Sequence, residues 1–291
     1  MMASATFAPG NPPGAPLAVP GTLEETQVRA MFDRIAGLYD RMNTVMTAGL
    51  HHQWRRRAAD LAALRPGDRA LDVATGTGDL ALELAGRVAP GGSVVGADFS
   101  ERMLALARIK ADRRRVGPQA VVGADFSERM LALARVKADR RRVGPQAVEV
   151  RFESANALAL PYDDDTFDAA TVGFGARNFS DLQQGLRELV RVVVPGGRVV
   201  VLELTTPGRQ PLSIFFELWF DRIVPALGQL AGDAQAYSYL PSSVRRFPGP
   251  RELAAAMSQC GLADIRYMLT AGGIIALHVG KKVGQPPGPS R

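Results

Sequence analysis

A glycine-containing turn near residue 75 follows a predicted strand and opens a predicted helix, and this junction constrains the fold more than any other feature. The strand covers residues 69–74 (RALDVA), the turn residues 75–79 and the helix residues 80–88. A second predicted strand, residues 93–98, follows a Pro-Gly-Gly turn. Because parallel strands need a crossover between them, this segment predicts a βαβ unit.

The rest of the chain continues the alternation of strands and helices. Further strands are predicted at residues 148–152, 167–172, 198–204, 264–268 and 273–279. Helices are predicted at residues 24–62, at the segment that Ser100 caps, and at residues 181–194, 210–230 and 251–260. We therefore predict an α/β fold with a seven-stranded, mostly parallel sheet, helices on both faces and an antiparallel pair at its end.

Length and composition fit one domain with a large core. The chain has 291 residues, of which 46% are hydrophobic. We expect a single domain at residues 23–282, with disordered tails at residues 1–22 and 283–291. No apolar run approaches the ~20 residues of a membrane span, and a lone cysteine, Cys260, fits a reducing compartment. A cytoplasmic location is expected.

Residues 94–120 recur almost unchanged as residues 121–147, and the only difference is Ile109 against Val136. Stacked structural repeats diverge, so this pair indicates a tandem duplication or an error of sequence assembly. Each copy holds six basic and three acidic residues, so one copy supplies half of the net charge of +6. The arginine triplets fall at predicted helix ends, where cations are favourable. We therefore predict no nucleic-acid partner.

The turn and the end of the second strand suggest a nucleotide-like cofactor. Gly76 and Gly78 let a ligand approach the backbone closely. Asp98 lies 20 residues after Gly78, where its carboxylate can accept both hydroxyls of a ribose. The spacing Gly76-x-Gly78-x-x-Ala81 also fits a dinucleotide such as NAD. Asp125 is the equivalent of Asp98 in the second copy, and the shorter link to residues 80–88 favours Asp98.

Three further features favour S-adenosylmethionine over NAD. Asp72, inside the first strand, can help to hold an ammonium group. Asn156-Ala157 follows the third strand, where it can bond an adenine edge. Pro195-Gly196-Gly197, before the fifth strand, is a turn common in methyltransferases. The chain is thus predicted to be an S-adenosylmethionine-dependent methyltransferase with a class I Rossmann-like fold.

Longer stretches of the sequence narrow the class of methyltransferase. From about residue 28 to 281 the chain resembles the ubiquinone/menaquinone-biosynthesis C-methyltransferases. The most specific matching segments are GFGARN at residues 173–178, YSYLPSS at residues 237–243 and GGIIALH at residues 272–278. The resemblance implies cofactor contacts at Thr77, Asp98 and Asn156-Ala157. Some relatives carry a serine where Gly173 stands, so a side-chain contact is absent there.

The resemblance implies a polyprenylated quinol as substrate. Overall similarity favours demethylmenaquinol; the benzoquinol of the ubiquinone pathway and another small molecule are the alternatives. A deprotonated ring hydroxyl would push electrons onto the ring carbon that attacks the S-methyl group. We hypothesise that Arg177 stabilises this phenolate, Asn178 and Tyr39 orient the ring, and Asp40 accepts a proton, directly or through water. A structural ion pair is the alternative for Arg177.

Histidines and one apolar stretch complete the candidates. His51, His52 and His278 lack metal-ligand spacing, so we predict structural roles and no metal. Residues 211–230 could line a prenyl tunnel, rest against a bilayer or pack as a lid helix, which makes peripheral membrane contact plausible. The sequence carries no signal for an oligomeric state.

Overall fold

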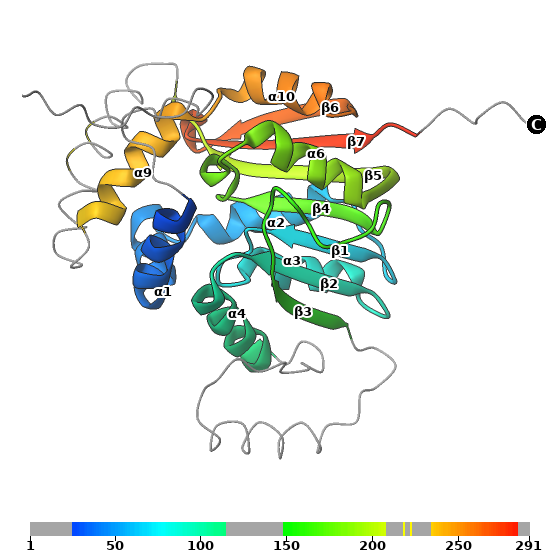
Figure 1. Cartoon of the computed structure of the whole chain (residues 1–291), viewed down its shortest axis with the longest axis horizontal. Coiled ribbons are helices and arrows are strands. Elements are labelled where there is room, and N and C mark those ends of the chain that lie inside the picture. Colours follow the sequence, from blue (N-terminus) through cyan, green and yellow to red (C-terminus); the bar gives the residue numbers. More distant parts are fainter. Residues whose placement is uncertain (1–24, 115–147, 208–217, 219–221, 223–233, 285–291) are drawn as a thin grey trace, which may run out of the picture.

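One twisted sheet organises the molecule (Figure 1). The computed structural model describes residues 25–114, 148–207, 218, 222 and 234–284. The seven strands follow the order β3-β2-β1-β4-β5-β7-β6. They are β1 (Arg69–Val73), β2 (Ser93–Asp98), β3 (Glu149–Ser154), β4 (Phe167–Gly173), β5 (Val193–Leu204), β6 (Leu262–Thr270) and β7 (Ile275–Lys282). Only β7 runs antiparallel to its neighbours among these strands, so the predicted sheet is confirmed.

Helices cover both faces of the sheet. The described helices are α1 (Glu25–Thr47), α2 (His51–Leu61), α3 (Asp79–Val88), α4 (Glu101–Arg114), α6 (Leu182–Val192), α9 (Ala234–Arg246) and α10 (Pro250–Gln259). Short 3₁₀ turns lie at η1 (Ala176–Asn178) and η3 (Ala271–Gly273). Buried side chains of α2, α3 and α4 pack on one face, and those of α6 and α10 pack on the other.

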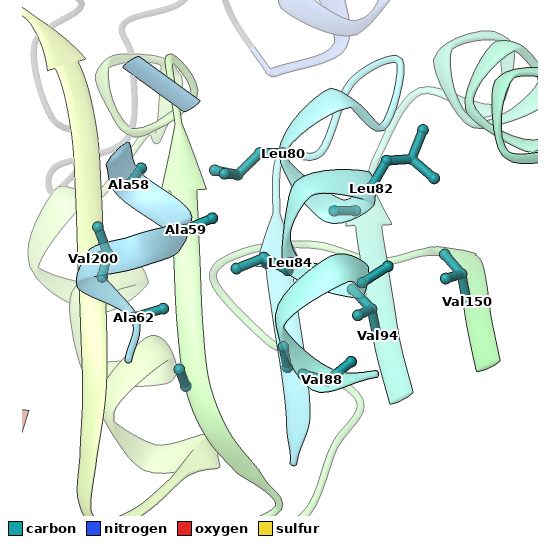
Figure 2. Close-up of a cluster of buried hydrophobic side chains, with 14 of the residues drawn as sticks. Ala58, Ala59, Ala62, Leu80, Leu82, Leu84, Val88, Val94, Val150 and Val200 are labelled. Carbon is teal, nitrogen blue, oxygen red and sulfur yellow. The ribbon is translucent and has the colours of Figure 1, made fainter. Parts of the chain in front are cut away.

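Small and branched residues make the first of these cores tight (Figure 2). Ala58 and Ala59 of α2, with Ala62 at its C-terminal cap, let that helix approach Val200 of β5, and all four are buried. Leu84 of α3 is completely buried in the same cluster. Burial of apolar surface at roughly 25 cal/mol per Å² is the main force that holds these helices on the sheet.

Two predicted elements differ from the structure. The single helix expected at residues 24–62 is divided into α1 and α2, because Ala48 and Gly49 adopt φ values of +48° and +77°. The turn expected at residues 195–197 lies inside β5 as an irregularity. There the register between β5 and its neighbour β4 shifts between the β4 residues Phe167 and Ala169. Gly197 is required there, because a Cβ would lie 2.6 Å from the Asp168 carbonyl oxygen.

The first copy of the duplicated sequence fills its predicted place in the sheet. It supplies β2 from Val94 onward and all of α4, whose first turn is capped by Ser100 through the Met103 amide (3.2 Å). The second copy, with Asp125, lies outside the described residues. The expected helix at residues 210–230 likewise lies outside them, apart from Leu218 and Arg222.

Candidate functional site

Two cavities adjoin at the carboxyl ends of the parallel strands. The loop cavity is lined by the ends of β1, β2 and β4 and by the segment after β3, including Asp72, Gly76, Asp98 and Asn156. The helix cavity lies beside it under α1 and α2 and has a volume of about 460 Å³. Open α/β sheets bind ligands at this edge, so both cavities are candidate binding sites.

Asp98 is fixed against the glycine loop. Its Oδ2 accepts a hydrogen bond from the Gly76 amide (2.8 Å), and its Oδ1 accepts one from the Ser100 amide (2.9 Å). Gly76 has φ +55°, a left-handed conformation that glycine adopts without strain. Burial raises the pKa of Asp98 to about 6, although both backbone bonds oppose that rise. The carboxylate and the loop therefore form one rigid wall of the loop cavity.

Asp72 is a second buried carboxylate in the same cavity. It is 1% exposed and accepts hydrogen bonds from the hydroxyls of Thr75 and Thr171, both at 2.7 Å. Burial raises its pKa to about 6. Among the described residues, neither Asp72 nor Asp98 takes part in an ion pair. Both are therefore available to a ligand that carries donors.

Asp40 has a different environment from the one expected of a proton acceptor. Its carboxylate pairs with Lys110 (2.8 Å) and accepts a hydrogen bond from the Thr77 hydroxyl (2.6 Å). Lys110 also pairs with Asp79 (2.7 Å) and donates to Thr77 Oγ1 (2.9 Å). Asp40 lines neither cavity. Asp40 meets Lys110 because α1 packs against α4.

Gly78, predicted with Gly76 to contact the cofactor, packs closely against neighbouring elements. It has φ +80°, and a Cβ there would lie 2.9 Å from both the Ala107 Cβ and the Phe152 ring. It does not line the loop cavity. Of the two loop glycines only Gly76 faces that cavity, and Gly78 allows α3 to begin against α4 and β3.

The other predicted cofactor residues line the loop cavity as well. Thr77, Asn156 and Ala157 are among its walls. The Asn156 side-chain oxygen accepts a hydrogen bond from the Leu158 amide (2.9 Å), which holds the turn after β3. Gly173, at the end of β4, lines the same cavity. The structure thus brings together residues from four separate segments of the chain.

A common wall joins the two cavities. Phe32, Tyr39, Arg55 and Phe174 line both of them. The rest of the helix cavity is largely apolar, with Met31, Ile35, Met42, Met46, Trp54 and Ile274 among its walls. A polar ligand in the loop cavity and an apolar ligand in the helix cavity would therefore meet at this wall. Tyr39 lies there, as its predicted role requires.

Arg177 and Asn178 lie on either side of this boundary. Arg177 lines the helix cavity, and its guanidinium pairs with Glu203 (2.7 Å), with side-chain exposures of 7% and 1%. The structural ion pair weighed for Arg177 is therefore present, and its charge is already balanced. Asn178 lines the loop cavity, and its Oδ1 accepts a hydrogen bond from the Tyr239 hydroxyl (3.3 Å).

Two residues of α2 were missed as site candidates. Arg55 is 7% exposed, pairs with Asp79 (3.5 Å) and lies over the Phe174 ring at 5.6 Å. His51 is 2% exposed, lines the helix cavity and shares a hydrogen bond with Thr47 Oγ1 (2.8 Å). Residues four apart lie on the same face of a helix, so this spacing in the sequence could have indicated that His51 and Arg55 face the same site.

His51, His52 and Asp79 come together although their sequence spacing gives no sign of it. Their ligand atoms lie within 4.8 Å of one another. Lys110 and Arg55 already balance the Asp79 carboxylate. Burial, and then electrostatic interactions with Arg55 and His52, lower the pKa of His51 to about 4. The cationic side chains make this cluster unfavourable for a metal ion.

Known proteins match nearly all of this chain. The sequence model of the ubiE/COQ5 methyltransferase family matches residues 21–117 and 113–282. A demethylmenaquinone methyltransferase of Thermus thermophilus is 44% identical over 253 residues, which are 87% of this chain and 100% of the relative. Its counterpart in Deinococcus radiodurans is 41% identical (88% and 92% covered). The ubiquinone/menaquinone biosynthesis C-methyltransferase UbiE of Geobacter sulfurreducens is 38% identical (88% of each).

Solved structures share the fold at low sequence identity. The [4+2]-cyclase SpnF aligns with a TM-score of 0.57 and 18% identity, covering 90% of this chain and 98% of its own. A SAM-dependent methyltransferase from Thermotoga maritima, a possible histamine N-methyltransferase, aligns with a TM-score of 0.53 and 17% identity (87% and 98% covered). Since one neighbour is a cyclase, this likeness identifies the fold and not the reaction.

Proposed function

Because the chain belongs to the ubiE/COQ5 methyltransferase family, we propose that it transfers a methyl group from S-adenosylmethionine to a ring carbon of demethylmenaquinol. The names of the Thermus and Deinococcus relatives favour this acceptor. The Geobacter relative's name covers ubiquinone as well, so the benzoquinol of that pathway is the second candidate. Family membership leaves no support for the NAD alternative.

The main support for this proposal is that the two cavities meet. A methyl group can be transferred only if donor and acceptor meet in line within about 3–3.5 Å. The loop cavity offers buried carboxylates to a nucleoside, and the helix cavity offers apolar walls to a prenylated ring. Phe32, Tyr39, Arg55 and Phe174 surround the place where the two ligands would touch.

The loop cavity suits S-adenosylmethionine by its donor set. We assign the ribose hydroxyls to Asp98, the ammonium group to Asp72 and the adenine edge to Asn156-Ala157. Two carboxylates without a described cationic partner fit a ligand that brings hydroxyls and an ammonium group. When bound, this cofactor supplies a methyl group made electrophilic by its sulfonium.

The helix cavity suits the quinol and the first part of its tail. Its volume of about 460 Å³ lies in the range of ligand pockets. We assign the orientation of the ring to Tyr39, which lines both cavities, and to Asn178, which approaches from the loop cavity. Arg177 is held by Glu203 and would act on a ring oxygen only as part of that pair. Asp40 supports Thr77 and the glycine loop rather than the ring.

We place the enzyme in the cytoplasm, in peripheral contact with the membrane that holds its prenylated substrate. Among the described helices, none is both long and apolar enough to cross a membrane.

We further take residues 23–282 as one methyltransferase domain, since α1 and α9 complete the cavities that the sheet begins. The two helices lie beside each other near one end of the sheet (Figure 1).

The decisive experiment pairs two aspartates in identical local sequence. We expect Asp98→Ala to weaken binding of S-adenosylhomocysteine by roughly 10²-fold, since hydrogen bonds to a charged group contribute about 1.5–3 kcal/mol. Asp125→Ala, in the second copy of the same ADFSERML stretch, should bind like the unmutated chain. Calorimetry and methyl transfer to demethylmenaquinol in detergent measure both. Equal losses, or a loss only at Asp125, would contradict the assignment of Asp98; no transfer by the unmutated chain would contradict the function.

A further inference from the structure

Methylation of an aromatic carbon releases a proton that some group must accept. The ring carbon takes the methyl group while the sulfonium becomes a thioether. The carbon then carries both a methyl group and its original hydrogen. Aromaticity returns only when that C–H bond breaks and its electron pair enters the ring. This requirement rests on the proposed function, and the two original candidates for handling protons or charge, Asp40 and Arg177, are both held in ion pairs.

The walls of the helix cavity offer few proton acceptors. The titratable side chains among its described lining residues are Tyr39, His51, Arg55, Arg177 and Tyr239. Arginine keeps its proton at any accessible pH, and a neutral tyrosine hydroxyl is a very weak base. Of these five, only His51 has a neutral form with a basic lone pair.

A chain of hydrogen bonds fixes which nitrogen of His51 carries the lone pair. The Thr47 hydroxyl donates its proton to the Asn43 carbonyl oxygen (2.7 Å). Thr47 Oγ1 can then only accept from His51 Nδ1, which lies 2.8 Å away. Nδ1 therefore carries the hydrogen of the neutral ring, and Nε2 is left with the free lone pair.

Burial, together with nearby side chains, keeps His51 neutral at physiological pH. Burial, then Arg55 and His52, lower its pKa, whereas Asp79 and Asp40 act in the opposite direction and are weaker. The resulting pKa of about 4 makes His51 a weak base. A weak base is sufficient here, because the proton on a methylated, non-aromatic ring carbon is strongly acidic.

We propose that His51 Nε2 accepts the proton from the newly methylated ring carbon. The C–H electron pair restores the aromatic ring, His51 becomes an imidazolium, and it returns the proton to solvent as product leaves. Its position on α2, one turn before Arg55 of the common wall, places it next to the junction of the two cavities.

The test compares His51→Gln with His52→Gln in single-turnover methyl transfer to demethylmenaquinol. His52 is the adjacent residue in sequence, is exposed and lines neither cavity. Its ring contacts that of His51 (centroids 3.9 Å apart) and lowers the His51 pKa, so its loss should make His51 more basic and leave the proposed base in place. We expect His51→Gln to slow formation of the aromatic, methylated product by about 10²–10⁴-fold with unchanged affinity for S-adenosylhomocysteine, and His52→Gln not to slow it. Deuterium on the reacting ring carbon should slow His51→Gln further than it slows the unmutated enzyme, because proton removal becomes rate-limiting.

A second variant covers the case in which His51→Gln does not fold. Thr47→Val removes the acceptor of the Nδ1 hydrogen, and we expect kcat to fall about tenfold with little change in KM. A folded His51→Gln variant with the unmutated rate and isotope effect overturns the assignment. If only Thr47→Val folds, an unchanged kcat overturns it, whereas absence of transfer by the unmutated enzyme counts against the proposed function instead.

Discussion

Asp72 shows how one residue couples the stability of this protein to its ligand. The side chain is 1% exposed, and its described partners are hydroxyl groups, which stabilise the charge less than a cation would. Its pKa of about 6 lies above the value of an unfolded chain, near 3.9. Folding therefore disfavours the ionised form, and the free energy of unfolding falls as pH rises from about 4 through 6.

Asp72→Asn should remove this penalty. The Thr75 and Thr171 hydroxyls can rotate to serve an amide, so the fold should tolerate the change. We expect the variant to be more stable than the unmutated chain by roughly 1 kcal/mol at pH 4.5 and roughly 3 kcal/mol at pH 7, from about 1.4 kcal/mol per pKa unit. Urea unfolding at both pH values measures this, and affinity for S-adenosylmethionine should fall. A variant less stable at pH 7 would show that the hydroxyls fully compensate the charge.

For single residues, the sequence predicts the position of side chains at or near the ends of strands. It does not predict side-chain contacts that depend on how the helices pack. Asp72, Asp98 and Asn156 could be predicted because strand ends of a parallel sheet converge on one edge. The partner of Asp40 could not, since Lys110 lies 70 residues away and meets it only when α1 packs on α4. The neighbours of His51 are likewise set by packing, because α2 contacts both α1 and α3.

Helix α3 begins at a position that only glycine fits. Gly78 has a left-handed φ of +80° and the Phe152 ring and Ala107 at the place of a Cβ. Gly91, after the same helix, has an almost identical φ of +81° but open space around it. The two glycines therefore separate the cost of backbone strain from the cost of crowding.

Alanine at each of these glycines should give unequal losses of stability. Strain alone costs about 1–2 kcal/mol, which we expect for Gly91→Ala. Gly78→Ala adds overpacking of about 1–3 kcal/mol, because α3, α4 and β3 must separate. Chemical denaturation of the two variants gives the difference. Equal losses would mean that the Phe152 ring moves aside at little cost.

Elements with strong local signals were predicted within a residue or two. β1 and β2 are short apolar runs bounded by turns, and both appear where expected. The break between α1 and α2 was missed because the apolar spacing continues past Gly49. Pro195-Gly196-Gly197 has the composition of a turn and predicts one, whereas pairing with β4 keeps this segment in the sheet as an irregularity of β5.

For the whole molecule, the duplication is placed where the sheet tolerates it. The described part of α4 reaches Arg114 and β3 begins at Glu149, so the second copy falls between the described parts of these two elements. Parallel strands already require a crossover at this position, and the cost of a longer connection rises only slowly with its length.

Deleting residues 121–147 should leave the fold and the activity intact. The deletion joins Ala120 to Val148 and removes none of the described elements. We expect the same circular dichroism, the same affinity for S-adenosylhomocysteine and a free energy of unfolding equal to or above that of the full chain. Loss of cofactor binding on deletion would show that the second copy contributes to the site.

The reciprocal deletion leads to almost the same molecule. Removing residues 94–120 instead leaves a chain that differs only by valine in place of Ile109, a side chain that is 47% exposed on α4. Losing one methylene at such a position has little energetic effect. Recombination between the two copies could therefore remove either one, at any crossover point, and leave a gene for almost the same protein. Because the single-copy and two-copy proteins are expected to fold and act alike, natural selection would neither retain nor remove the second copy.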